Sequence, residues 1–321
     1  MWLSPSILLM ILSVMTSVLL VASSSSLFIS WMGLELNTLA FLPLLLSKKN
    51  KLTSESSIKY FLAQTLASVI VVAGGLSLLV WGEGGISKEM ILLGLAIKLG
   101  AAPFHSWLIT VAESLGWVPL FVLLTIQKLN PLLMVWNFSQ SSSSLLYSII
   151  FFSLALGALL GLAQTSTRAL MTFSSINHVG WLLASSALSL QATLVYFTVY
   201  STILLAPILL LYIANISHLN ELPFVQLSLQ HQYLFYFCLL SLGGLPPFLG
   251  FLPKWMILQL LMSISFYTLS LVMILMSLFT LFFYLRLMFT AFIFGGDKIL
   301  QNKNLSLPLF TSFLLSLSVG G

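Results

Sequence analysis

Long apolar runs recur from the first residues of the chain to the last, and short stretches rich in Ser, Gly, Pro, Asn or charge separate them. A helix needs about 20 such residues to cross the roughly 30 Å hydrocarbon core of a bilayer. The pattern therefore predicts an all-α, polytopic membrane protein with about eleven transmembrane helices. The expected spans are residues 5–22, 27–46, 57–81, 88–112, 118–136, 145–163, 168–188, 193–213, 233–258, 266–289 and 305–319.

Two equal spacings indicate an internal repeat. Glu35 and Pro103 are 68 residues apart, and so are His178 and Pro246; a Pro-Phe pair begins at Pro103 and again at Pro247. Many transporters consist of repeated halves with a broken helix in each. We therefore expect one membrane-embedded domain over residues 1–321, with a first repeat at 1–137, a second at 145–290 and a C-terminal helix at 305–321.

Composition excludes several classes of function. Of the 321 residues 59% are hydrophobic and 6% are charged, whereas a soluble domain carries about 25% charged residues. The net charge of +5 comes from basic residues scattered among apolar runs, without the basic patch that nucleic-acid binding requires. Cys238 is the single cysteine, so an internal disulfide and a cysteine-ligated metal cluster are not expected. Asp297 is the single aspartate, and no Ser-His-Asp set, dinucleotide fingerprint or paired metal-ligand histidines are recognisable.

Basic residues gather in alternate loops between the expected spans. The even-numbered loops carry Lys48, Lys49, Lys51, Arg168, Lys298 and Lys303. The odd-numbered loops hold Lys88, which Glu83 and Glu89 outweigh. Because loops rich in Lys and Arg stay on the cytoplasmic or matrix side, the N-terminus and the even-numbered loops are predicted to lie there, with the C-terminus opposite.

Four charged residues fall inside expected spans: Glu35, Lys98, Lys128 and Lys254. Each charged group at membrane depth costs about 2.5 to 3.5 kcal/mol on insertion scales, so such residues usually have a function. A buried amine exchanges protons near neutral pH far more readily than a solvated one, and a nearby carboxylate stabilises its charged form. The set therefore indicates proton transport, although a structural ion pair between Glu35 and a lysine remains an alternative.

Lys98 precedes a proline at membrane depth. Pro103 removes an amide donor and clashes with the carbonyl four residues earlier, so we expect the helix to break close to Lys98. Broken backbone survives in a membrane only where it lines protein or water. Together with His105, Lys98 would then occupy a hydrated, titratable site; a packing kink with a snorkelling lysine is the alternative.

Lys254 follows a second set of helix breakers. Residues 243–253 contain Pro246, Pro247 and Pro253 as well as three glycines, which cannot form a continuous helix. This segment is the second predicted broken helix. The alternative is a loop between two short helices, with Lys254 at the membrane interface.

Lys128 and His178 have polar neighbours in sequence. Gln127 and Asn130 offer hydrogen-bond partners to Lys128, although a lysine paired with a carboxylate purely for packing would look the same. His178 lies in Ser174–Trp181 and could relay protons near neutral pH. It could equally be a hydrogen-bonded core residue.

Six separate stretches together form one signature: Trp31–Pro43, Ser54–Gln64, Lys98–Trp107, Gln127–Pro131, Ser174–Trp181 and Gly243–Trp255. In order and spacing they resemble the chain 2 family of mitochondrial NADH-ubiquinone oxidoreductase, an antiporter-like family of respiratory complex I. The match covers most of the chain, and the set is specific although each stretch alone would be modest. Asn130 departs from the alanine that the family carries beside its central lysine.

The resemblance implies an antiporter-like membrane-arm subunit that couples electron transfer from NADH to ubiquinone to proton pumping, as part of a translocase. The animal form lacks three N-terminal helices, which would truncate the first repeat. By resemblance, Glu35 pairs with Lys98, Lys128 is the central lysine, and Lys254 lies on the exit side. His178 joins these residues as a candidate relay.

The resemblance also implies a location and partners. The chain would lie in the mitochondrial inner membrane with its N-terminus on the matrix side. It would contact membrane lipids, protons and other membrane-arm subunits, including neighbouring antiporter-like ones. It would hold no cofactor, because the flavin and the iron-sulfur clusters belong to other subunits.

Two other functions use the same residues. A free-standing cation/proton antiporter of the Mrp type would need the same buried charges. A structural subunit that only links neighbouring pumps would tolerate neutral replacements at Lys98, Lys128 and Lys254.

Overall fold

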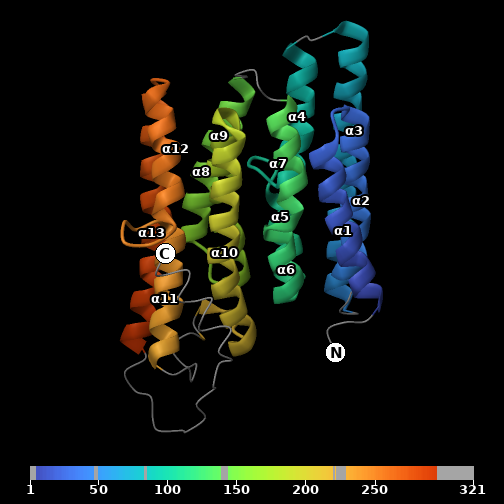
Figure 1. The fold of residues 1–321 in the computed structure, drawn as a ribbon. Coiled ribbons are helices and arrows are strands. Elements are labelled where there is room, and N and C mark those ends of the chain that lie inside the picture. Colours follow the sequence, from blue (N-terminus) through green and yellow to red (C-terminus); the bar gives the residue numbers. More distant parts are fainter. Residues whose placement is uncertain are drawn as a thin grey trace. The chain divides into compact units, whose positions relative to one another are not determined.

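A computed structural model describes residues 5–46, 50–82, 85–138, 144–219, 221 and 229–294. Within these ranges the chain is helical, with no strand beyond an isolated bridge between Ser166 and His218. The helices (Figure 1) are α1 (Pro5–Ser23), α2 (Leu27–Leu45), α3 (Lys51–Trp81), α4 (Gly85–Leu99), α5 (Ser106–Ser114), α6 (Trp117–Leu124), α7 (Ile126–Phe138), α8 (Ser144–Leu162), α9 (Thr167–Leu188), α10 (Leu190–Ala214), α11 (Leu229–Gly243), α12 (Phe251–Ser263) and α13 (Tyr267–Phe294).

Six helical segments in the described ranges are long and apolar enough to cross a membrane: Leu27–Leu45, Lys51–Trp81, Trp117–Asn137, Ser144–Leu162, Leu190–Ala214 and Tyr267–Phe289. Shorter apolar helices accompany them, such as Phe251–Ser263. The prediction of an all-α, multi-pass membrane protein is confirmed. The number of eleven spans stays a prediction, and the helix expected at 305–319 lies outside the described residues.

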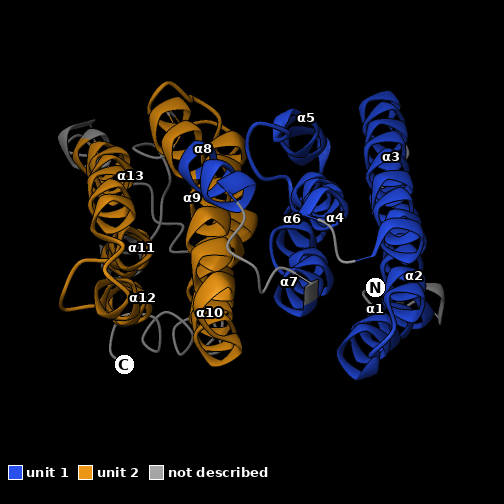
Figure 2. Ribbon diagram, turned by 90° about the horizontal axis from the view of Figure 1, so that it is seen from above, with its two compact units in different colours: residues 1–153 blue, residues 154–321 orange. Residues whose placement is uncertain are grey.

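The chain divides into two compact units, residues 1–153 and 154–321, coloured separately in Figure 2. In the first unit, α3 packs against α2, α4 and α5, and α7 packs against α1, α2 and α4. In the second unit, α9, α10 and α12 pack against one another, and α13 contacts α11 and α12. The repeats predicted at 1–137 and 145–290 stay predictions.

Three of the expected spans are each divided into two helices. The interruptions between α4 and α5 and between α11 and α12 were expected from their prolines. The interruption at Thr125, between α6 and α7, was not, although the two helices together form the apolar segment Trp117–Asn137, in agreement with the span expected at 118–136. Here the Thr125 hydroxyl donates to the Phe121 carbonyl at 2.7 Å, while the Thr125 carbonyl accepts from the Lys128 amide at 2.9 Å. A threonine that bonds the backbone in this way competes with regular helix geometry.

The close contact between α3 and α4 depends on a glycine. A Cβ atom at Gly94 would lie 2.8 Å from the Ala67 carbonyl oxygen and 2.6 Å from a Val71 methyl group. The missing side chain therefore lets the two helix backbones approach. One turn after Gly94, the same helix carries Lys98 into the core of the first unit.

Candidate functional site

Glu35 on α2 and Lys98 on α4 form an ion pair in the first unit, in which the lysine is buried and the glutamate is partly buried. The Lys98 Nζ atom lies 3.0 Å from Glu35 Oε1, and the side chains are 1% and 24% exposed, respectively. The Thr38 hydroxyl donates to the Glu35 carbonyl at 2.8 Å and lies 3.5 Å from Glu35 Oε2. The pair expected from the resemblance is therefore present, and each charge compensates the other where water is scarce.

The α4 helix ends directly after Lys98, as its proline predicted. Gly100 takes a left-handed conformation with φ of 67°, and a cis peptide bond joins Ala102 to Pro103 before α5 begins at Ser106. Side chains from neighbouring helices bind the carbonyls at this end. The Trp107 Nε1 atom donates to the Ile97 carbonyl at 3.0 Å. Such partners make an interrupted helix tolerable at membrane depth.

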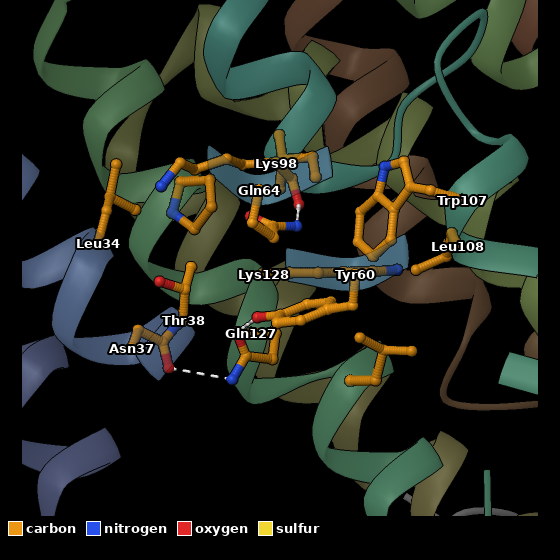
Figure 3. Close-up of a pocket in the computed structure, with 13 residues that line it drawn as sticks. Leu34, Asn37, Thr38, Tyr60, Gln64, Lys98, Trp107, Leu108, Gln127 and Lys128 are labelled. Carbon is orange, nitrogen blue, oxygen red and sulfur yellow. Dashed lines mark hydrogen bonds between the residues drawn. The ribbon is translucent and has the colours of Figure 1, made fainter. Parts of the chain in front are cut away.

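Lys98 and Lys128 line one pocket within the first unit (Figure 3). Both lysines are buried, and the polar residues between them come from three helices. The Gln127 side chain donates to the Asn37 amide oxygen at 3.1 Å and accepts from the Tyr60 hydroxyl at 3.3 Å. The two lysines therefore line the same pocket as polar side chains that can donate and accept hydrogen bonds.

Asn37, Tyr60 and Gln64 are among the residues of this pocket that sequence reasoning missed. The Gln64 amide donates to the Lys98 carbonyl at 3.4 Å. A signal was available, because Tyr60 and Gln64 lie four residues apart on α3, on the same helix face. Asn130, expected to serve Lys128, instead donates to the Ser17 hydroxyl at 3.1 Å.

Lys254 lies in the core of the second unit, 5% exposed. Its Nζ atom donates to the carbonyls of Gly243 at 2.8 Å and Leu242 at 3.3 Å, at the C-terminal end of α11. The helix interruption therefore supplies the acceptors for this amine. Pro246 and Pro247 lie in the turn between α11 and α12, where the sequence predicted the second break.

His178 is buried on α9, and its Nδ1 atom lies 2.8 Å from the Tyr196 hydroxyl on α10. The His178 ring also lies 4.8 Å from that of Tyr200. His178 and Pro253 line one narrow pocket, so the structure brings the histidine close to the start of α12. Glu35, Lys98 and Lys128 are thus grouped in the first unit, and His178 and Lys254 in the second.

In the loop after α10, the Glu221 carboxylate binds backbone N–H groups. The backbone N–H of Ser217 donates to Glu221 Oε2 at 2.7 Å and, with that of His218, holds the pKa of the Glu221 carboxyl below its usual range. In the described ranges, no three His, Cys, Asp or Glu side chains are grouped closely enough to hold a metal ion.

The fold and these sites define a class: a multi-pass helical membrane protein with buried lysines beside two interrupted helices. A family model described as NADH:quinone oxidoreductase/Mrp antiporter matches residues 24–280. NADH-ubiquinone oxidoreductase chain 2 of Anopheles gambiae is 39% identical over 321 residues, covering 94% of this chain and 92% of that one. The protein of the same name from Mus musculus is 35% identical over 284 residues, covering 84% and 81%. The chain belongs to the NADH-ubiquinone oxidoreductase chain 2 family.

Solved structures share the fold. A chain of respiratory complex I from Thermus thermophilus, solved with bound aureothin, aligns with a TM-score of 0.83 at 21% identity, over 98% of this chain and 76% of that one. A chain of the Mrp complex from Dietzia aligns with a TM-score of 0.78 at 19% identity, over 87% and 59%. The antiporter-like fold of this chain is therefore shared by both kinds of complex.

Proposed function

We propose that this chain is a proton-translocating membrane-arm subunit of NADH:ubiquinone oxidoreductase, and thus part of a translocase. It would couple electron transfer from NADH to ubiquinone to proton movement through its buried glutamate and lysines. The Glu35–Lys98 ion pair carries the proposal, because its lysine lies at the end of an interrupted helix and lines a pocket together with Lys128. Protonation of either amine changes the charge in that pocket, which is what a stepwise proton transfer requires.

The proposed partners and location follow from family membership. The chain would assemble with other complex I subunits, including neighbouring antiporter-like ones, in the mitochondrial inner membrane, surrounded by lipids. The flavin and the iron-sulfur clusters would be held by other subunits, and this chain would hold no cofactor.

The N-terminus is proposed to face the matrix. Within the second unit, Arg286 on α13 donates to the Leu162 carbonyl at 2.6 Å and to the Gln164 carbonyl at 3.3 Å. The loop after α8, which leads into the first turn of α9 with Arg168, therefore lies beside Arg286. Both basic residues gather at the same end of this unit, as a matrix-side assignment of these loops requires.

Replacement of the buried pair tests the proposed function. We expect Lys98→Met and Glu35→Gln to impair NADH-driven proton pumping and ubiquinone reduction in the reconstituted complex, while NADH oxidation by an artificial acceptor stays intact. Lys59→Met is the matched control, because Lys59 is an exposed lysine of α3 that pairs with Glu55. Normal pumping with Lys98→Met or Glu35→Gln would contradict the proposal.

A free-standing cation/proton antiporter is the second candidate, supported by the shared fold with the Mrp chain. Purification in mild detergent separates the two functions. Co-purification with flavin and iron-sulfur proteins would support the complex I assignment. A small assembly without redox groups, together with sodium-dependent proton exchange, would support the antiporter.

A further inference from the structure

The Lys254 amine has three kinds of neighbour in the second unit: backbone carbonyls, a glycine and an aromatic ring. The Gly243 and Leu242 carbonyls accept its hydrogen bonds. The side chain lies against Gly244, where a Cβ atom would be 2.9 Å from both Nζ and Cδ of Lys254. On a third side the Nζ atom lies 5.6 Å from the centroid of the Trp181 ring. That distance is within the roughly 6 Å over which a ring face attracts a cation.

The contacts of Trp181 indicate which part of its side chain interacts with Lys254. Trp181 is fully buried, and its Nε1 atom has no hydrogen-bond partner among the described residues. A buried N–H without an acceptor destabilises a fold, and phenylalanine would present a ring without that N–H. Tryptophan has the ring that attracts a cation most strongly. The face of Trp181, and not its N–H, is therefore the part that the site uses.

The Trp181 ring lies parallel to the ring of Tyr196. The two rings are stacked, with an interplanar angle of 6° and centroids 6.3 Å apart. The hydroxyl of Tyr196 is in turn bonded to His178 at 2.8 Å. A continuous line of contacts therefore runs from His178 through Tyr196 and Trp181 to the Lys254 amine, across α9, α10 and α12.

Among the described residues of the second unit, no carboxylate forms an ion pair with the Lys254 amine. Residues 154–321 contain two acidic residues, Glu221 and Asp297. Glu221 lies in the loop after α10, where Ser217 and His218 bind its carboxylate. Among the described residues, the amine of Lys254 thus meets helix-end carbonyls, which carry partial negative charge, and an aromatic face.

We propose that Trp181 is a positioning residue for proton transfer, and that its ring face stabilises the ammonium form of Lys254 at the end of α11. Tyr196 keeps this face turned toward the amine. Lys254 would then bind its proton beside backbone carbonyls and an aromatic ring, whereas Lys98 binds its proton beside the Glu35 carboxylate. This inference rests on the proposed function, because it assigns a proton-binding role to Lys254.

The pH profile of coupled turnover tests the role of Trp181. We expect Trp181→Leu to move the alkaline limb of NADH-driven proton pumping to lower pH by roughly 0.4 to 1.5 pH units, because the ammonium form loses its aromatic partner. Trp181→Phe, which keeps a weaker ring face, should give a smaller shift in the same direction. A uniform fall in rate with an unchanged profile in both variants would overturn the proposal.

Other titratable groups near Lys254 need a control. They are His178 on α9, Tyr196 and Tyr200 on α10, and Tyr284 on α13, all buried. In water an imidazole titrates near pH 6.5 and a phenol near pH 10. A shift of the acid limb alone, near the range of an imidazole, would point to His178 and overturn the assignment to Lys254.

Trp255→Leu is the matched tryptophan control. Trp255 follows Lys254 on α12, but it is half exposed and stacks on Phe251. Its replacement should leave the pH profile unchanged, and an equal shift there would contradict a specific role of Trp181. If Trp181→Leu fails to assemble, the profile of Trp181→Phe decides the outcome.

Lys254→Met separates failure of this inference from failure of the proposed function. Unchanged pumping in Lys254→Met would remove the proton-binding role of Lys254, and with it both proposals for that residue. Impaired pumping in Lys254→Met, combined with an unchanged profile in both Trp181 variants, would refute the role of Trp181 alone.

Discussion

Lys98 and Lys254 lie beside interrupted helices in different units, but their charges are stabilised in different ways. Lys98 lies at the end of its own helix, and Glu35 lies 3.0 Å from its amine. Lys254 lies near the start of α12, and its amine reaches the last carbonyls of α11. An ion pair changes strongly when one partner moves, whereas carbonyls at a helix end are fixed dipoles. The comparison shows that one fold can stabilise a buried lysine with a side-chain carboxylate or with backbone carbonyls at a helix end.

The largest expected effect comes from removing the carboxylate that pairs with Lys98. Glu35→Leu leaves the buried Lys98 amine without its carboxylate, and breaking a buried pair in this way costs about 3 to 5 kcal/mol of unfolding free energy. The double variant Glu35→Leu/Lys98→Leu removes both charges and should recover most of that loss. The dissociation temperature and the yield of assembled complex measure the difference. A single variant as stable as the double variant would show that Lys98 does not depend on Glu35.

The second prediction concerns the backbone that holds Lys254. A Cβ atom at Gly250 would overlap the carbonyl of Ser241, and a backbone group cannot move aside as a flexible side chain can. Gly250→Ala should therefore separate α11 from α12 and destabilise the second unit by about 1 to 3 kcal/mol. Pumping should fall as the carbonyls move away from the amine.

Gly85→Ala is the control for the glycine replacement. A Cβ atom at Gly85 would meet nothing within 4 Å, so assembly and pumping should stay at the level of the unmodified complex. Equal tolerance of Gly250→Ala would show that the approach of Ser241 is not required for the Lys254 site.

The smallest expected effect sharpens the contrast between buried and exposed pairs. Lys59 and Glu55 lie 2.7 Å apart on α3, but their side chains are 48% and 62% exposed. Exposed pairs four residues apart on a helix contribute about 0.3 to 0.5 kcal/mol. Lys59→Ala should therefore change the dissociation temperature of the complex barely measurably. A loss as large as that of Glu35→Leu would contradict the view that burial makes the Glu35 pair important.

The sequence alone determined the class of fold and the chemistry at its centre. Apolar runs of spanning length required helices, since in a bilayer each helix satisfies its backbone internally. A charged side chain at membrane depth costs free energy, and this marked four residues as unusual: Glu35, Lys98, Lys128 and Lys254. Pro103, and Pro246 with Pro247, marked the interruptions because proline lacks an amide donor. These properties belong to single residues or short segments, so they can be recognised without knowledge of the neighbours.

Only the tertiary structure decided which side chains surround these lysines. Gln127 meets Asn37 across 90 positions of sequence, and Tyr60 across 67. Trp181 and Lys254 are likewise brought together from different helices. In an almost wholly apolar chain, hydrophobic periodicity is too weak to show which way a helix faces, so a buried partner and a lipid-facing residue look alike in sequence. The rotation and packing of each helix, set by close contacts such as that at Gly94, determine the partner of each charge.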